Sequence, residues 1–237
     1  NGGSAVAGAA VTIGTKPDLS GYTTTKKGFR FGGWFLDRAL TEQADGAAVT
    51  RDTTLYAKWL PATRFADVSG SEWFAEALDW AVGAGIVTGV TPTQFGPGLT
   101  GTRAQVLAML WRASGSPDVS GASPFADVQD PSAWYYKAVL WAAQNGIAQG
   151  DKGKFDPDRP VTRAELITLL WRLAGSPEPK GQANPFTDVA QKDYYYKAVL
   201  WAHENGIAQG MKPTAFDPAE PCTRAQLVTF LWRYFSK

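Results

Sequence analysis

The sequence predicts a mainly α-helical protein with a small β-rich domain at its amino terminus. Two observations lead to this fold class. Three segments of about sixty residues resemble one another, and each contains two stretches with helical periodicity. The first sixty residues instead show strand-like alternation. We therefore expect a β-rich domain at 1–60 and helical repeats at 61–118, 119–179 and 180–237.

The repetition is carried by short motifs that return in the same order. Phe-x-Asp-Val at 65–68 recurs at 125–128 and 186–189, and Thr-Arg-Ala segments place an arginine at three equivalent positions. Repeats two and three also share Lys-Ala-Val-Leu-Trp-Ala and Asn-Gly-Ile-Ala-Gln-Gly, whereas repeat one is more divergent. Because a unit of this size with two helices buries too little surface to fold alone, we expect the repeats to pack together.

Each repeat is expected to form two helices. In repeat two, apolar residues at 135, 138, 139 and 142 make one stripe, and Gly146 suits the left-handed position after the helix end. The second helix is expected to begin after Thr162, whose side chain forms a capping box with that of Glu165. Gln105 and Gln226 replace this glutamate in the other repeats, and glutamine also serves in a capping box.

The first sixty residues are expected to form strands. Residues 29–31 alternate and then meet two glycines, which suggests a strand with a bulge or a close backbone approach. Residues 55–59 alternate with the period of a half-buried strand, and Pro61 is expected to end the domain. Residues 1–3 are typical of a tight turn whose preceding strand lies outside this sequence.

Composition sets aside several classes of protein. Hydrophobic content of 44% and charged content of 19% describe an ordinary globular protein, and a net charge of +1 argues against a nucleic-acid partner. The single Cys222 excludes an internal disulfide and a cysteine-based zinc site. No apolar run reaches the length of a membrane-spanning helix, and no signal peptide is visible. We expect a fragment of a longer secreted protein, without metal or cofactor and without membrane insertion.

The repeats resemble the S-layer homology family. Phe-x-Asp-Val, Gly-Ile-x-x-Gly, Phe-x-Pro and Thr-Arg-Ala follow one another in each repeat, and the resemblance covers residues 61–237. It implies a three-fold pseudo-symmetric assembly with a central three-helix bundle and grooves between repeats. Such grooves bind secondary cell-wall polysaccharide, often ending in pyruvylated N-acetylmannosamine. The resemblance thus implies a monomeric, non-enzymatic anchor at the Gram-positive cell surface.

The amino-terminal domain resembles the Listeria–Bacteroides (internalin-type B) repeat. Residues 28–34 and 54–59 match its most recognisable stretches. Such repeats are similar to the β-grasp fold and act as spacers or adhesive modules. We therefore expect wall attachment not to depend on residues 1–60.

The candidate ligand-binding residues occupy equivalent positions in the three repeats. An arginine in the first turn of a helix is mildly unfavourable beside the helix dipole, so each arginine implies a compensating anion. That anion is either an aspartate of the chain or a ligand carboxylate held by the planar guanidinium. The aromatic residue at the start of each first helix either belongs to the core or stacks on sugars, and one glycine per repeat either allows a left-handed turn or lets a sugar approach. The set comprises Arg103, Arg163, Arg224, Asp67, Asp127, Asp188, Trp73, Trp134, Tyr194, Gly89, Gly150 and Gly210.

Two functions other than wall binding are also compatible with these repeats. The repeats could form a protein-interaction or lattice-forming module, whereas a glycan-cleaving enzyme would need two carboxylates across a cleft, and no such pair stands out. His203 has no counterpart in the other repeats and is expected to be a solvated helix residue. Among the arginines, we expect Arg163 or Arg224 to bind a carboxylate more tightly than Arg103. We expect this because glycines in the loop of repeat one should position its arginine less well.

Overall fold

The structure is a computed structural model that describes residues 2–26, 29–45, 47–61, 65–181 and 183–236. Two positions of the expected amino-terminal turn and first strand, residues 1 and 28, lie outside this part of the chain. The chain divides into two compact units. The first comprises Asn1–Ala75 and Pro92–Phe95, and the second comprises Glu76–Thr91 and Gly96–Lys237.

The first unit contains a two-stranded antiparallel sheet, formed by β1 (Phe29–Phe35) and β2 (Tyr56–Pro61). Phe31 pairs with Trp59 and Trp34 pairs with Ala57, so β1 has one more residue than β2 between these pairs. Gly33 lies in this stretch with φ of +103°, a conformation that glycine adopts without strain. The expected strands and the irregularity at the glycine pair are confirmed.

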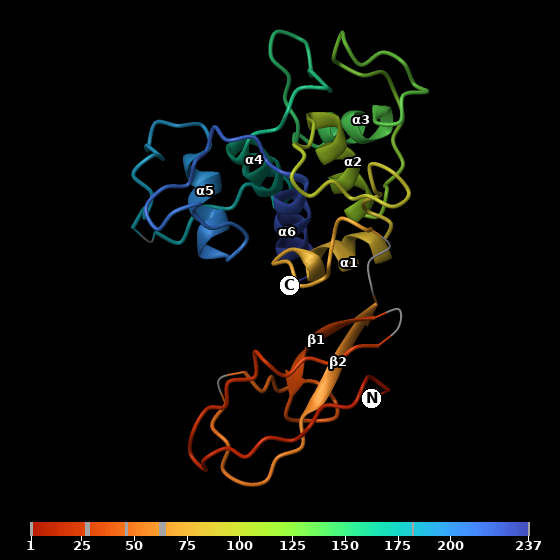
Figure 1. The fold of residues 1–237 in the computed structure, drawn as a ribbon. Coiled ribbons are helices and arrows are strands. Elements are labelled where there is room, and N and C mark those ends of the chain that lie inside the picture. The colour runs from red at the N-terminus through yellow and green to blue at the C-terminus, as the bar shows by residue number, and fades with distance from the viewer. Residues whose placement is uncertain (1, 27–28, 46, 62–64, 182, 237) are drawn as a thin grey trace. The chain divides into compact units, whose positions relative to one another are not determined.

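Within the described residues six helices follow, two in each repeat. Their arrangement can be followed in Figure 1. The first helix of one repeat contacts the second helix of the preceding repeat, since α3 contacts α2 and α5 contacts α4. The order is cyclic, because Trp80 of α1 stacks on Phe235 of α6 with 6.3 Å between ring centroids. Helix α6 also contacts α2 and α4. The helices are α1 (Ala75–Gly83), α2 (Arg103–Ala113), α3 (Tyr136–Gln144), α4 (Arg163–Leu173), α5 (Tyr196–Glu204) and α6 (Arg224–Phe235).

Local sequence accounts for where these helices begin and end. Thr102, Thr162 and Thr223 are the N-caps of α2, α4 and α6, and all three capping boxes are present as expected. At the end of α3, Gly146 has φ of +67° and donates its N–H to Ala143 O. The N–H of the next residue, Ile147, donates to Ala142 O, which completes a Schellman motif. The helical reading of the repeats is therefore confirmed, and no helix in the described ranges is long and apolar enough to cross a membrane.

The residues that lead into the second helices are joined by a closed cycle of backbone hydrogen bonds. Gly101 N–H donates to Cys222 O at 3.0 Å, Cys222 N–H to Val161 O at 2.8 Å, and Val161 N–H to Gly101 O at 3.0 Å. Gly101 is needed at its position, because a Cβ there would overlap the Cδ1 atom of Leu227 from repeat three. Each repeat thus donates to one neighbour and accepts from the other.

Candidate functional site: arginines at the repeat junctions

The first helical residue of α2 is an arginine that reaches into the next repeat. Arg103 Nε donates to Phe155 O at 2.8 Å, and Nη2 donates to Gln149 O at 3.1 Å. The guanidinium carbon also lies 4.6 Å from the centroid of the Phe155 ring. Arg103 therefore fastens repeat one to the Gly-Ile-x-x-Gly and Phe-x-Pro loop of repeat two. We call this contact junction 1–2.

The other two arginines repeat the arrangement. At junction 2–3, Arg163 Nε donates to Phe216 O at 2.9 Å, and Nη2 donates to Gln209 O at 2.8 Å. At junction 3–1, Arg224 Nη2 donates to Thr88 O at 2.7 Å. All three side chains are buried, with residue exposures of 9%, 2% and 4% for Arg103, Arg163 and Arg224. The arginines are thus structural links between repeats, whatever else they bind.

The aspartates of the Phe-x-Asp-Val motifs accept hydrogen bonds from backbone N–H groups of the same loops. Asp127 Oδ1 accepts the N–H of Phe155 at 2.8 Å, and Oδ2 accepts the N–H of Asp156 at 2.7 Å. Burial opposes ionisation of Asp127, but these two hydrogen bonds keep the pKa of its carboxyl below the usual value. Asp188 accepts the equivalent N–H groups of repeat three, and Asp67 accepts that of Phe95.

Of the two anions considered for each arginine, an aspartate of the chain is ruled out as an ion-pair partner of Arg103 and Arg163 within the described ranges. The carboxylate bound by Arg103 is that of Glu165, at 3.5 Å from Nη1. No carboxylate in the described part of the chain lies within ion-pair distance of Arg163. Asp127 and Arg103 instead bind the same loop separately, one through the N–H and the other through the carbonyl of Phe155.

Glu165 lies at the centre of junction 1–2. Arg159 Nη2 donates to Glu165 Oε1 at 2.5 Å, and the Thr162 N–H donates to Oε2 at 2.9 Å. Burial favours the protonated form, but the hydrogen bonds from Arg159 and Thr162 and the charge of Arg103 lower the pKa of the Glu165 carboxyl. Glu165 therefore carries a negative charge that faces two arginines.

At junction 2–3 the arginine retains one nitrogen without a partner. Arg163 Nη1 makes no hydrogen bond in the described part of the chain. Arg163 is also one of the largest fully buried side chains of the chain, with a residue exposure of 2%. Burial lowers the pKa of Arg163, although the nearby Cys222, Asp217 and Asp188 oppose that shift. Arg163 is thus a buried cation with one nitrogen, Nη1, that makes no hydrogen bond in the described ranges.

A second set of arginines, which the sequence analysis missed, lies at the same loops. Arg172 Nη1 donates to Ile147 O at 3.2 Å, and Nη2 donates to Gln149 Oε1 at 3.2 Å. Arg112 and Arg233 donate to the equivalent isoleucine carbonyls, Ile86 O and Ile207 O. The signal was the Trp-Arg pair near the end of each second helix. Each junction thus combines two arginines from neighbouring repeats.

The three aromatic candidates lie on the surface. Trp73, Trp134 and Tyr194 are 65%, 59% and 64% exposed, so the core interpretation is wrong for them. Each packs edge-to-face against the aromatic residue that follows, as in the 5.2 Å contact of Trp134 with Tyr135. Trp134 and Tyr194 lie in the turns before α3 and α5, two residues ahead of the helices. The charges of junction 1–2 also act on Tyr194. Burial, followed by the charge of Glu165, raises the pKa of its hydroxyl, and nearby arginines only partly oppose this shift.

The candidate glycines support the protein's own backbone. A Cβ at Gly150 would overlap Lys154 O and the Phe125 ring, and one at Gly210 would overlap Lys212 O and Ala215 O. Neither Gly150 nor Gly210 has a positive φ, so the left-handed interpretation is wrong for both. Gly89 is half-buried in repeat one.

The left-handed residue of the loop is instead the one before its proline. Asp156 and Asp217 have φ of 55° and 56°, and Gly96 has φ of 70°. Glycine is the least strained residue in that conformation, so Gly96 does not weaken the loop of repeat one. That loop also holds Arg224, not Arg103, through Thr88. The reason given above for ranking Arg103 last is therefore wrong.

The remaining candidates have structural roles. His203 is half-buried, with its ring 5.2 Å from that of Phe186, so its assignment as a solvated residue is wrong. Cys222 is buried in the backbone cycle, where burial raises the pKa of its thiol to about 12. Within the described ranges, no group of three histidine, cysteine, aspartate or glutamate side chains is arranged to hold a metal ion.

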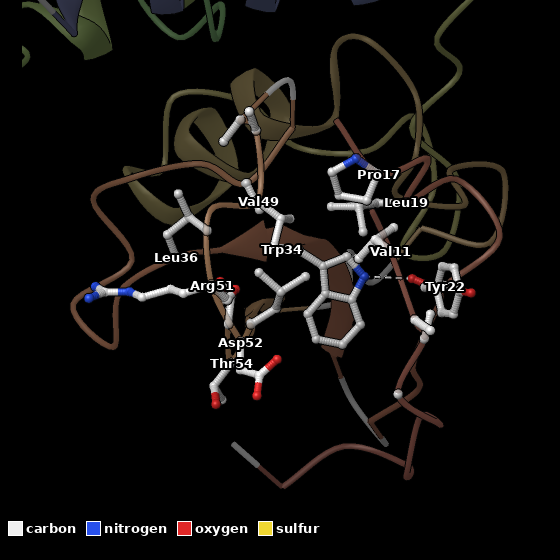
Figure 2. Close-up of a pocket in the computed structure, with 18 of the residues that line it drawn as sticks. Val11, Pro17, Leu19, Tyr22, Trp34, Leu36, Val49, Arg51, Asp52 and Thr54 are labelled. Carbon is white, nitrogen blue, oxygen red and sulfur yellow. Dashed lines mark hydrogen bonds between the residues drawn. The ribbon is translucent and has the colours of Figure 1, made fainter. Parts of the chain in front are cut away.

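The first unit has a cavity of about 1070 Å³. Figure 2 shows Trp34 beside it, with Val11, Leu19, Leu36 and Val49 around the indole. The indole Nε1 donates to Tyr22 O at 2.6 Å, so its polar atom is already bound. The lining combines these apolar side chains with charged ones, among them Asp18, Glu42, Arg51 and Asp52.

Helical repeats closed into a cycle, with a buried arginine at each junction and an exposed aromatic residue in each repeat, define a module built from helical repeats. The chain belongs to the S-layer homology family. The S-layer homology domain matches residues 64–107, 124–167 and 185–228, and the Listeria–Bacteroides repeat domain matches residues 1–58.

Relatives carry these repeats within much longer proteins. The chain is 29% identical to an amylopullulanase of Thermoanaerobacterium thermosulfurigenes over 70% of its own length and 9% of the relative. It is 36% identical to a cell surface protein of Thermoanaerobacter kivui over 47% of its length and 15% of the relative. A surface-layer 125 kDa protein of Lysinibacillus sphaericus is 33% identical over 50% of the chain and 10% of the relative.

Proposed function

We propose that the chain anchors a larger protein to the bacterial cell wall by binding wall polysaccharide at the junctions between its repeats. The ligand group that fits is a carboxylate, as in pyruvylated N-acetylmannosamine. The observation that carries this proposal is Arg163, a buried cation without an ion-pair partner in the described part of the chain, whose Nη1 makes no hydrogen bond there. Burying a charge is costly unless an anion compensates it, and a guanidinium is suited to a carboxylate.

The relatives support an anchor and not a catalyst. Proteins named as an amylopullulanase, a cell surface protein and a surface-layer protein share these repeats, although their names describe different activities. A segment common to proteins of different activity is expected to supply something other than catalysis, and the names of two of the three refer to the cell surface or surface layer. We propose that this chain is not an enzyme, requires no cofactor and acts as a monomer.

The architecture proposed for this function is three-fold. The backbone cycle through Gly101, Val161 and Cys222 and the three arginine junctions support a pseudo-three-fold arrangement with α2, α4 and α6 at its centre. We retain repeat boundaries at 61–118, 119–179 and 180–237, with a β-grasp-like spacer at 1–60. The exposed Trp134 and Tyr194 are proposed to stack on sugar rings beside the junction arginines, and the exposed Trp73 is proposed to stack on a sugar ring as well.

The proposal is tested by sedimentation with purified cell walls. Walls that retain their secondary polymer should bind the chain, whereas walls stripped of that polymer, or of its pyruvyl groups alone, should not. A chain lacking residues 1–60 should bind as well as the full chain. Equal binding to stripped walls would contradict polysaccharide recognition and would favour the lattice-forming alternative.

A further inference from the structure

The junctions differ at one position beside the arginine. Glu165, at junction 1–2, is the third residue of α4, and Gln226 is the third residue of α6. The two helices begin in the same surroundings. Arg103 N–H donates to Arg159 O, just before α4, and Arg163 N–H donates to Glu220 O, just before α6. Gln226 therefore holds at junction 2–3 the place that Glu165 holds at junction 1–2.

At junction 1–2 an internal carboxylate already faces the arginine. Glu165 Oε1 lies 3.5 Å from Arg103 Nη1 and 2.5 Å from Arg159 Nη2. A ligand carboxylate would have to displace Glu165 from both arginines or accept its repulsion at close range. Because Glu165 is partly buried, with 18% of its side chain exposed, solvent screens that repulsion only in part.

At junction 2–3 the equivalent side chain is neutral and can donate. Gln226 Oε1 accepts the Thr223 N–H at 3.1 Å, while Nε2 donates to Met211 Sδ at 3.4 Å. A thioether is a weak acceptor, so the Gln226 Nε2 group would form a stronger hydrogen bond if it donated to a ligand carboxylate instead of Met211. Glu220 occupies the position equivalent to Arg159, but it is exposed and makes no ion pair in the described part of the chain.

We propose that the residue at this position selects which junction binds the ligand carboxylate. Arg163 Nη1 and the Gln226 amide bind it at junction 2–3, and Glu165 fills the corresponding place at junction 1–2. This inference rests on the proposed function and adds a specificity-determining pair to it. Junction 3–1 has the neutral Gln105 in this position, so it is expected to accept a ligand carboxylate as junction 2–3 does.

The test exchanges the two residues in the full chain. Three variants, E165Q, Q226E and the double exchange E165Q/Q226E, are titrated calorimetrically with the methyl glycoside of 4,6-O-pyruvyl-N-acetylmannosamine, and with its methyl ester as the uncharged control. Both substitutions should preserve folding, because glutamine and glutamate each complete a capping box in this chain. Thermal midpoints close to that of the parent verify this.

Q226E should weaken binding of the charged glycoside at junction 2–3 by roughly tenfold or more, the loss expected for one charge-assisted hydrogen bond. E165Q should add a binding site, and the double exchange should restore affinity while moving its dependence from Arg163 to Arg103. Conservative R163K and R103K substitutions in each background locate the site.

Two results separate this inference from the proposed function. If the parent binds the glycoside and its ester equally weakly, carboxylate recognition fails and the inference fails with it. If the parent prefers the charged glycoside but Q226E and E165Q bind like the parent, or R103K alone removes binding, the selection by Glu165 and Gln226 is wrong and the anchoring function stands.

Discussion

Asp127 and Arg103 belong to different repeats but hold the same residue. The Asp127 carboxylate accepts the N–H of Phe155 at 2.8 Å, and Arg103 Nε donates to the carbonyl of Phe155 at 2.8 Å. Repeat two therefore stabilises its own loop through Asp127, and repeat one binds that loop through Arg103. Stability of the loop and contact between the repeats are coupled through this one residue.

Asp127→Asn should lower the free energy of unfolding by about 1–3 kcal/mol, because the new amide group would face the Asp156 N–H with a donor. Urea denaturation monitored by tryptophan fluorescence measures this change. Asp158→Asn is the matched control, since Asp158 is exposed and makes no hydrogen bond or ion pair within the described ranges. It should change stability by no more than about 0.5 kcal/mol. Equal effects of the two substitutions would contradict the role of Asp127.

Local features of the fold could be predicted from the sequence, whereas the partners of charged residues could not. The capping boxes depend on residues three apart in sequence, such as Thr162 and Glu165, so short motifs contain all the information. The partner of Arg103 is a backbone carbonyl 52 residues away in another repeat. A carbonyl has no side-chain signature, so the sequence pointed only to anions, either an aspartate of the chain or a ligand carboxylate, as partners of the arginine.

Gly101→Ala should destabilise the second unit by about 1–3 kcal/mol, because the added methyl group would overlap the buried Leu227. Thermal denaturation measures the loss. Gly98→Ala is the control, since a Cβ at Gly98 meets nothing within 4 Å. Leu227→Val should offset part of the Gly101→Ala loss, so the double variant should be more stable than the two single losses predict. Strictly additive losses would mean that this contact is not the cause.

Cys222 should resist alkylation in the folded protein. Its side chain is buried and its thiol has a pKa of about 12, so almost no thiolate exists at pH 8. A maleimide should react only when the backbone cycle opens, and its rate should rise sharply across the urea transition. Mass spectrometry of the intact chain follows the reaction. Rapid labelling without denaturant would show that the cycle is open in solution.

The exposed aromatic residues should contribute to binding and not to stability. Tyr194→Ala and Trp134→Ala remove rings that are mostly exposed, so each should change the free energy of unfolding by no more than about 0.5 kcal/mol. Loss of the Trp134 ring should weaken binding to wall polysaccharide by about 1 kcal/mol, roughly fivefold. Tyr194→Ala should have a smaller effect, because Tyr194 lies near the charges of junction 1–2, where Glu165 fills the place of the ligand carboxylate. Calorimetry with polymer fragments measures this loss, and Trp73→Ala extends the series to repeat one.

Ile13→Ala is the control for a general loss of apolar surface, because Ile13 is 72% exposed in the first unit. It should leave wall binding unchanged. Analytical ultracentrifugation of the same variants distinguishes the remaining alternative, because aromatic rings that hold neighbouring subunits together would be needed for self-association. Parent-like wall binding together with reduced self-association in Trp134→Ala and Tyr194→Ala would assign these rings to a lattice contact, and the sugar-stacking role would be wrong.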